Sequence, residues 1–274
     1  MNSGEPAPAV SAGAGHASPS IRLPDVTAPN NARIYDALAG GKDNLPSDRD
    51  VAEQLCRITP TLPAQIHGAR AFLRRSVEQL TDMGVRQFLN LGCGLPISDN
   101  VHQVARRMAP QARVVYVDDD PMVASHGRAF LNTPDEGARF IKADVRQISG
   151  LLDQLEADFL DPGQPIAVLA CNFLHFLPDV EAHRIVSALR TWLAPGSHLV
   201  ISHFTSEWLQ FVADDIVAVY RKAGLLIFPR SSSEIAAMYQ GFQLSYEGIA
   251  PIRWDSDDAQ GAHFAGGMGW PEEP

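Results

Sequence analysis

Cysteine is scarce in this chain of 274 residues, and its three cysteines, Cys56, Cys93 and Cys171, lie far apart. An odd, widely spaced set gives neither a disulfide framework nor zinc-site spacing, and it is typical of a reducing compartment. No apolar run approaches the ~18–20 residues of a membrane span, and the first residues lack a signal-peptide pattern. We therefore expect a soluble, cytoplasmic protein without a membrane partner or a metal site.

Basic residues are also in short supply. The 22 lysines and arginines against 32 aspartates and glutamates give a net charge of −10, which disfavours attraction to nucleic acid and anionic lipid. The hydrophobic fraction of 45% is sufficient for a full core. This composition favours a small-molecule substrate and leaves the oligomeric state undetermined.

The chain divides into three predicted parts. Residues 1–28 are rich in Ala, Gly, Ser and Pro, as in a disordered tail. Residues 29–84 predict an N-terminal helical cap, with helices near 32–39, 48–57 (Ser47 as N-cap) and 64–83. In residues 85–274 strands and helices alternate, which predicts an α/β fold with a doubly wound, mostly parallel sheet. Residues 241–254 alternate like strands and are expected to supply an antiparallel edge strand.

The strongest motif lies between Arg86 and Pro121. It predicts a buried strand at 88–91, a Gly92-Cys93-Gly94 turn, a helix over about 98–108, and a strand at 114–117 that ends at Asp118. In such a βαβ unit the glycines let the backbone approach a ligand, and the acid accepts hydrogen bonds from both ribose hydroxyls. The unit predicts a nucleoside site at Gly92, Gly94 and Asp118, with Asp119 beside them.

One glycine is missing from this unit. The dinucleotide fingerprint G-x-G-x-x-G requires glycine at position 97, where this chain has Ile97, and Pro96 stiffens the turn. The turn therefore suits a nucleoside ligand without a pyrophosphate, and S-adenosylmethionine is such a ligand. The alternatives are a plain tight turn and, for Asp118, a helix cap ahead of Pro121.

Residues after the later strands are further candidates, because ligands sit beyond the carboxyl ends of parallel strands. Asp144 is expected to bond the adenine amino group unless it is a structural turn residue, and Asn172 is a second cofactor contact. His175 and His203 are candidate general bases, with histidines satisfied inside the core as the alternative. Methyl transfer from a sulfonium needs little beyond in-line positioning, so no base is required.

The segment from Tyr35 to Asn44 combines two glycines with a Lys-Asp-Asn cluster. Its spacing is not that of a P-loop, which needs an earlier glycine and a Ser or Thr after the lysine. It is either a helix cap followed by a turn or a lid over the cofactor, with Tyr35 or Asn44 touching the ligand.

Several segments together resemble an actinobacterial family of S-adenosyl methyltransferases, formerly catalogued as a domain of unknown function. They are Ala32–Asn44, Arg70–Arg75, Arg86–Pro96, Asn100–His102, Val114–Pro121, Leu174–Asp179 and Leu193–His203. The resemblance implies a class I methyltransferase-like fold and S-adenosylmethionine binding by Gly92, Gly94 and Asp118, and also by Asp144 and Asn172. The chain departs from the family pattern at Ala69, where an Asn is usual, and at Asp119 in VDDD, where VDND is commoner.

The leading hypothesis is a methyltransferase that acts on a small molecule. A non-catalytic sensor or partner-binding protein on the same fold is the alternative, because fold does not fix function. A nicotinamide-dependent oxidoreductase is disfavoured by Ile97 and by the lack of an evident Tyr-x-x-x-Lys pair.

Overall fold

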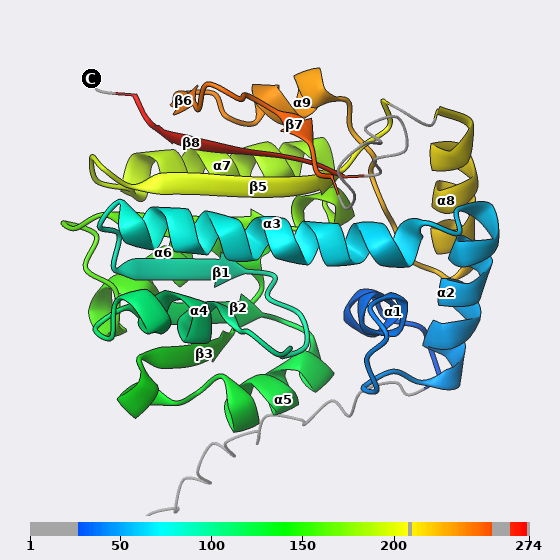
Figure 1. Ribbon diagram of the computed structural model, residues 1–274, viewed down its shortest axis with the longest axis horizontal. Coiled ribbons are helices and arrows are strands. Elements are labelled where there is room, and N and C mark those ends of the chain that lie inside the picture. The colour runs from blue at the N-terminus through cyan, green and yellow to red at the C-terminus, as the bar shows by residue number, and fades with distance from the viewer. Residues whose placement is uncertain (1–26, 208–209, 254–263, 273–274) are drawn as a thin grey trace, which may run out of the picture.

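The computed structural model describes residues 27–207, 210–253 and 264–272, so nearly all of the predicted tail lies outside the described residues. Within them, an eight-stranded sheet forms the centre of the molecule, in the order β3-β2-β1-β4-β5-β8-β6, with β7 pairing to β8 (Figure 1). The strands are β1 (Gln87–Leu91), β2 (Arg113–Asp118), β3 (Ala138–Lys142), β4 (Ile166–Cys171), β5 (His198–Phe204), β6 (Phe242–Leu244), β7 (Ala250–Pro251) and β8 (Phe264–Pro271). Strands β1 to β5 pair in parallel, which confirms the predicted mostly parallel sheet.

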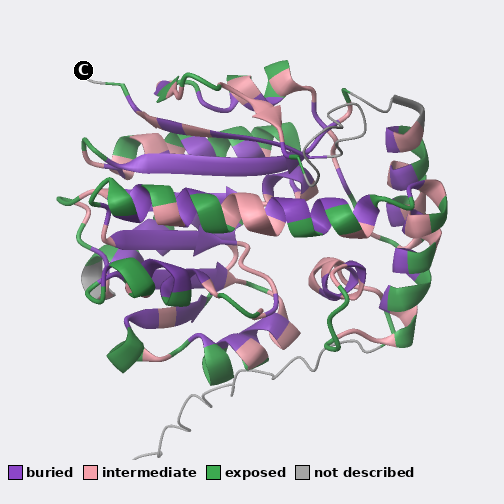
Figure 2. Cartoon of the chain, in the orientation of Figure 1, coloured by how far each residue is buried: buried purple, intermediate pink, exposed green. Residues whose placement is uncertain are grey.

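Helices cover both faces of this sheet. Side chains of α3 (Leu62–Asp82), α4 (Val101–Met108) and α5 (Pro121–Phe130) share a core with one face. Those of α6 (Ile148–Asp158), α7 (Asp179–Trp192) and α9 (Ser232–Ala237) pack on the other. Strand β1 is buried along its whole length, as expected for a parallel strand covered on both sides (Figure 2). Three single 3-10 turns, η1 (Pro134–Glu136), η2 (Val145–Gln147) and η3 (Leu174–Phe176), lie in the connections.

A helical cap stands beside the sheet and consists of α1 (Asn31–Leu38), α2 (Pro46–Ile58) and α8 (Gln210–Lys222) (Figure 1). Its apolar core joins Ile34, Leu55 and Ile216 to Phe204 and Phe264 at the ends of two strands. Helix α3 contributes to both parts: Leu62, Ile66 and Ala69 lie in the core of the cap, whereas Val77 and Leu80 pack on the sheet. Helix α8, which follows β5 in the chain, completes the cap.

The antiparallel part of the sheet agrees with prediction at its edge and differs next to it. The segment 241–254 supplies the antiparallel edge strand β6, as predicted, and the short strand β7, whereas the long strand β8, which was not predicted, lies between β5 and β6 and pairs antiparallel with both. Strand propensity does not predict β8, because the segment contains Gly266, Gly267 and Gly269 and glycine is unfavourable within a strand. Neighbouring side chains explain the glycines: a Cβ built on Gly267 would lie 2.6 Å from Ile249 Cδ1.

Among the described helices, none combines the length and apolar character that a membrane crossing requires.

Candidate functional site

A cavity of about 530 Å³ lies where β1, β2 and β4 end, and α1 and α3 border it. This volume is in the range of sites that bind a small molecule or cofactor. Of the predicted cofactor residues, seven line it: Tyr35, Gly92, Gly94, Asp118, Asp119, Asp144 and Asn172. The strand ends thus bring together residues that are far apart in the sequence.

The glycine turn has the conformation that its sequence predicts. Gly92 and Gly94 have φ of 61° and 66°, a left-handed region that favours glycine. A Cβ built on Gly92 would lie 2.1 Å from Cδ2 of Phe173, so the backbone here passes directly against an aromatic ring. A Cβ on Gly94 would meet no atom within 4 Å, and Gly94 borders the cavity, so its missing side chain leaves room for a ligand.

Asp118 ends β2 and faces the glycine turn. Its carboxylate accepts hydrogen bonds from the backbone N–H groups of Gly94 (2.9 Å) and Asp120 (3.0 Å). Burial raises the pKa of Asp118 to about 6; the two N–H donors oppose this shift, and the charges of Asp119 and Asp120 add to it. The carboxylate is therefore held in place at the cavity wall with acceptor capacity for ligand hydroxyls.

Asp144 is a structural turn residue, one of the two alternatives that the sequence left open, and it lies beside the cavity. Its carboxylate caps the turn η2 by accepting from the Arg146 N–H (2.9 Å), and it also pairs with the Arg146 guanidinium (2.9 Å). Burial raises its pKa, but the hydrogen bonds and charge of Arg146 outweigh this effect, so the net shift is downward. Asp144 is thus an ionised turn residue that also borders the cavity.

Asn172 and Tyr35 join the end of β4 to the cap. Asn172 has a φ of 53°, and its Nδ2 donates to the Tyr35 hydroxyl at 3.2 Å. Its Oδ1 accepts from the Ser202 hydroxyl at 3.0 Å, which fixes the orientation of the amide. This chain of bonds ties α1 to the ends of β4 and β5 at the cavity.

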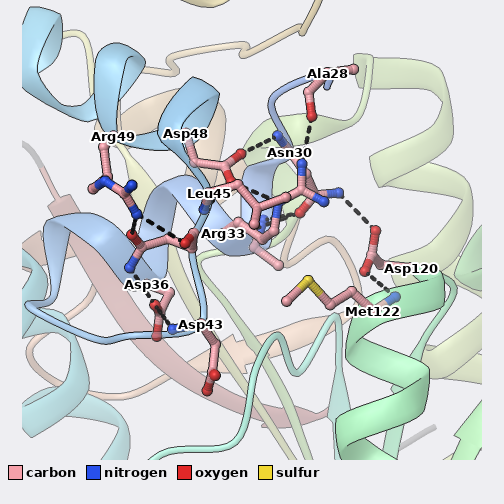
Figure 3. Close-up of polar contacts among 12 residues, drawn as sticks. Ala28, Asn30, Arg33, Asp36, Asp43, Leu45, Asp48, Arg49, Asp120 and Met122 are labelled. Carbon is pink, nitrogen blue, oxygen red and sulfur yellow. Dashed lines mark hydrogen bonds and ion pairs between the residues drawn. The ribbon is translucent and has the colours of Figure 1, made fainter. Parts of the chain in front are cut away.

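Asn44 does not border the cavity, contrary to prediction. Its Nδ2 donates to Asp36 Oδ2 (2.8 Å) and to the Gly41 carbonyl (3.0 Å), and Arg49 bonds its side chain in turn. Asp36 borders the cavity instead and accepts from the Asp43 N–H at 2.9 Å. Polar contacts therefore link the loop after α1 to Asp36 of that helix and to Arg49, and Figure 3 labels Asp36, Asp43 and Arg49 among these residues.

His175 and His203 lie outside the cavity lining, buried beneath the cap. His203 has both ring nitrogens engaged: Nδ1 donates to the Phe204 carbonyl (2.7 Å) and Nε2 accepts from Arg230 (2.7 Å). His175 Nδ1 accepts from the Phe204 N–H (3.2 Å). Burial lowers both pKa values, that of His203 to about 3, so the rings are neutral. The neutral His175 then carries its proton on Nε2, and neither ring has a free lone pair. The structure contradicts the general-base prediction on these grounds.

Several residues that were not predicted as site residues also border the cavity, namely Asn31, Asp36, Arg70, Asn90 and Asp120. The sequence could have identified Asn90 as a candidate, because it is a polar residue inside a fully buried strand. Arg70 lies on α3 together with Arg74 and Arg75, and only the packed structure shows that Arg70 and Arg74 border the cavity whereas Arg75 does not. In the described residues, no group of three or more His, Cys, Asp or Glu side chains is arranged to hold a metal ion.

The residues present fit S-adenosylmethionine. Gly94 leaves space for the nucleoside beside the Asp118 carboxylate, and the loop at Asp144 offers an acceptor for the adenine amino group. The carboxylates of Asp36, Asp118 and Asp119 surround the cavity with negative charge, which suits a sulfonium cation. Sheet order and site together define an S-adenosylmethionine-binding protein with a class I methyltransferase fold.

The comparisons identify the family. A family model described as S-adenosyl methyltransferase matches residues 17–268, and the chain belongs to this family of S-adenosylmethionine-dependent methyltransferases. A DUF574 family protein of Streptomyces avermitilis is 31% identical, with a TM-score of 0.85 over 90% of this chain and 99% of that one. A candidate methyltransferase of Thermobifida fusca is 34% identical, with a TM-score of 0.84 over 91% and 97% of the two chains. The comparison with curated proteins gave no match.

Proposed function

We propose that the protein transfers the methyl group of S-adenosylmethionine to a small-molecule acceptor within the cavity. The observation that carries this proposal is the hydrogen bond between Tyr35 and Asn172, which ties α1 across the strand ends. It leaves a chamber of about 530 Å³ for cofactor and acceptor together. A chamber of this size, bordered by α1 and α3, suits a small molecule and not a polymer.

Methyl transfer from a sulfonium requires mainly that the methyl donor and the acceptor are correctly positioned. When bound, the cofactor supplies a methyl group on a cationic sulfur, which a nucleophile displaces in line. Asp118 and Gly94 would hold the nucleoside, and the apolar side chains of Phe173, Phe176 and Leu177 line another part of the cavity. Orientation alone supplies a large part of such a barrier reduction, which agrees with the engaged nitrogens of the two buried histidines.

Charge also supports a small acceptor. Net charge is −10, and carboxylates of Asp36, Asp118, Asp119, Asp120 and Asp144 border the cavity. A phosphate backbone that approached these carboxylates would be repelled, because nucleic-acid affinity depends on neutralising phosphates with basic side chains.

Turnover on fractionated extract tests the proposal. The protein is incubated with S-adenosylmethionine that carries a radioactive methyl group and, in separate reactions, with the filtrate and the retained fraction of an ultrafiltered extract of the source organism, and S-adenosylhomocysteine and labelled product are measured. The expected result is labelled product in the small-molecule fraction, reduced with Asp118→Ala when the cofactor is limiting. Label confined to the retained macromolecules would contradict the small acceptor. Binding of the cofactor without turnover on any fraction would indicate a sensor.

A further inference from the structure

Two buried polar atoms at the cavity have no hydrogen-bond partner in the protein. They are Nε of Arg70, from α3, and Oδ1 of Asn31, the first residue of α1. Both residues border the cavity. Buried polar atoms are nearly always hydrogen-bonded, so a donor and an acceptor left over at one cavity indicate the chemistry of its ligand.

The guanidinium of Arg70 is held in a defined position. Its central carbon lies 5.1 Å from the centroid of the Tyr35 ring, and the Tyr35 hydroxyl is bonded to Asn172. This cation–π contact restrains the guanidinium, and arginine stays protonated at any physiological pH. A planar and permanently charged donor matches a carboxylate, which accepts two parallel N–H bonds.

We infer that Arg70 and Asn31 recognise the amino-acid head group of the cofactor. In this arrangement the Arg70 guanidinium binds the α-carboxylate, and Asn31 Oδ1 accepts a hydrogen bond from the α-ammonium. The inference rests on the cofactor of the proposed function and assigns to this chain the end of that ligand opposite to the ribose at Asp118. Because the Arg70 guanidinium of α3 lies over the Tyr35 ring of α1, both helices contribute to this subsite.

The two ends of the ligand are separable by experiment. S-adenosylhomocysteine carries the complete head group, whereas 5′-methylthioadenosine has the same nucleoside and a thioether but no amino acid. Isothermal titration of both compounds into the wild-type protein and into Arg70→Met, Arg70→Lys and Arg75→Met measures the contribution of the head group. Arg75 is an exposed neighbour on α3 outside the cavity lining, so its variant removes the same charge from the same helix.

The expected result is selective. Arg70→Met weakens S-adenosylhomocysteine by roughly 10- to 100-fold, the range for a hydrogen bond to a charged group, and leaves 5′-methylthioadenosine within about twofold. Arg70→Lys restores part of the affinity, because lysine keeps the positive charge but lacks the planar pair of N–H donors. Arg75→Met binds both compounds like the wild type. Thermal unfolding of each ligand-free variant establishes that it is folded.

Two outcomes would overturn the inference while leaving the cofactor in place: equal loss for both compounds in Arg70→Met, or no loss for either. If neither compound binds the wild-type protein, the proposed function fails and the head-group site fails with it. These patterns differ, so the two failures are distinguishable.

Discussion

The carboxylate of Asp118 lies between the glycine turn and the cavity. It holds the glycine turn through the Gly94 N–H and borders the cavity. Replacement by alanine removes the acceptor for the ribose hydroxyls, so we expect Asp118→Ala to weaken S-adenosylhomocysteine binding by about 1–3 kcal/mol. Calorimetric titration measures the loss. Asp135→Ala, at an exposed acid outside the cavity, is the matched control, and equal affinities of the two variants would contradict the ribose assignment.

The raised pKa of Asp118 makes binding depend on pH. Hydroxyl donors favour the ionised carboxylate, so ligand lowers the pKa of about 6 and binding releases protons near that pH. Affinity should therefore rise as pH increases through about 6, and this rise should be absent in Asp118→Ala. Titration in two buffers of different ionisation enthalpy detects the released proton. A wild-type affinity that stays constant from about pH 5 to about pH 8 would show that this carboxylate is not the acceptor.

Local sequence predicts those site residues whose positions follow from short-range backbone geometry, but it does not predict those that only tertiary packing brings to the cavity. Gly92, Gly94 and Asp118 belong to one contiguous βαβ unit, whose backbone geometry follows from short-range rules. Arg70 reaches the cavity only because α3 packs with one particular face against the sheet. His175 stands close to the site in sequence, but its ring turns away from the cavity to bond the backbone of β5.

Helices α1 and α5 are joined through their N-caps. Asn30 accepts from the N–H groups of Ala32 and Arg33, and its Nδ2 donates to Asp120 Oδ2 at 2.7 Å (Figure 3). Asp120 in turn caps α5 through the N–H groups of Met122 and Val123. One side-chain bond therefore fixes the start of α1 against the loop that follows β2.

Removing this cap should loosen α1. We expect Asn30→Ala to lower the free energy of unfolding by about 1 kcal/mol, as for other N-caps, and to speed amide hydrogen exchange in residues 31–38. Ser47→Ala is the control, because Ser47 was predicted to cap α2 but its hydroxyl has no partner, and Asp48 accepts from the Leu45 N–H instead. Equal effects of the two variants in urea unfolding and exchange would contradict this role of Asn30.

Strand β8 depends on its glycines for space. A Cβ on Gly267 would lie 2.6 Å from Ile249 Cδ1 and 2.8 Å from the Gly248 carbonyl oxygen, which is backbone and cannot move aside easily. Gly267→Ala should therefore cost about 1–3 kcal/mol of stability. Gly150→Ala, in exposed space on α6, should instead stabilise by roughly 0.5–1 kcal/mol through helix propensity. Denaturant unfolding compares the two, and a stable Gly267→Ala protein would show that β8 has more room than its contacts indicate.

The sheet was predictable from hydrophobic runs and a helical cap from residues 29–84, but the part that α8 takes in the cap was not. Residues 166–171 form β4, and a parallel strand that is buried on both faces has such a continuous apolar run. Amphipathic helices such as α2 and α8 show only that each has a buried face. Which faces meet is decided by tertiary packing, here around Phe204 and Phe264, so a helix after β5 joined the cap instead of the sheet layers.

Thermal unfolding with single ligands is the most direct test that this cavity holds S-adenosylmethionine. At about 100 times its dissociation constant, S-adenosylhomocysteine should add about 2.7 kcal/mol to the free energy of unfolding, a rise of roughly 5–10 °C in the midpoint for a chain of this size. NAD should leave the midpoint unchanged, because the turn lacks the third glycine. No shift with S-adenosylhomocysteine, or a shift with NAD alone, would contradict the assignment.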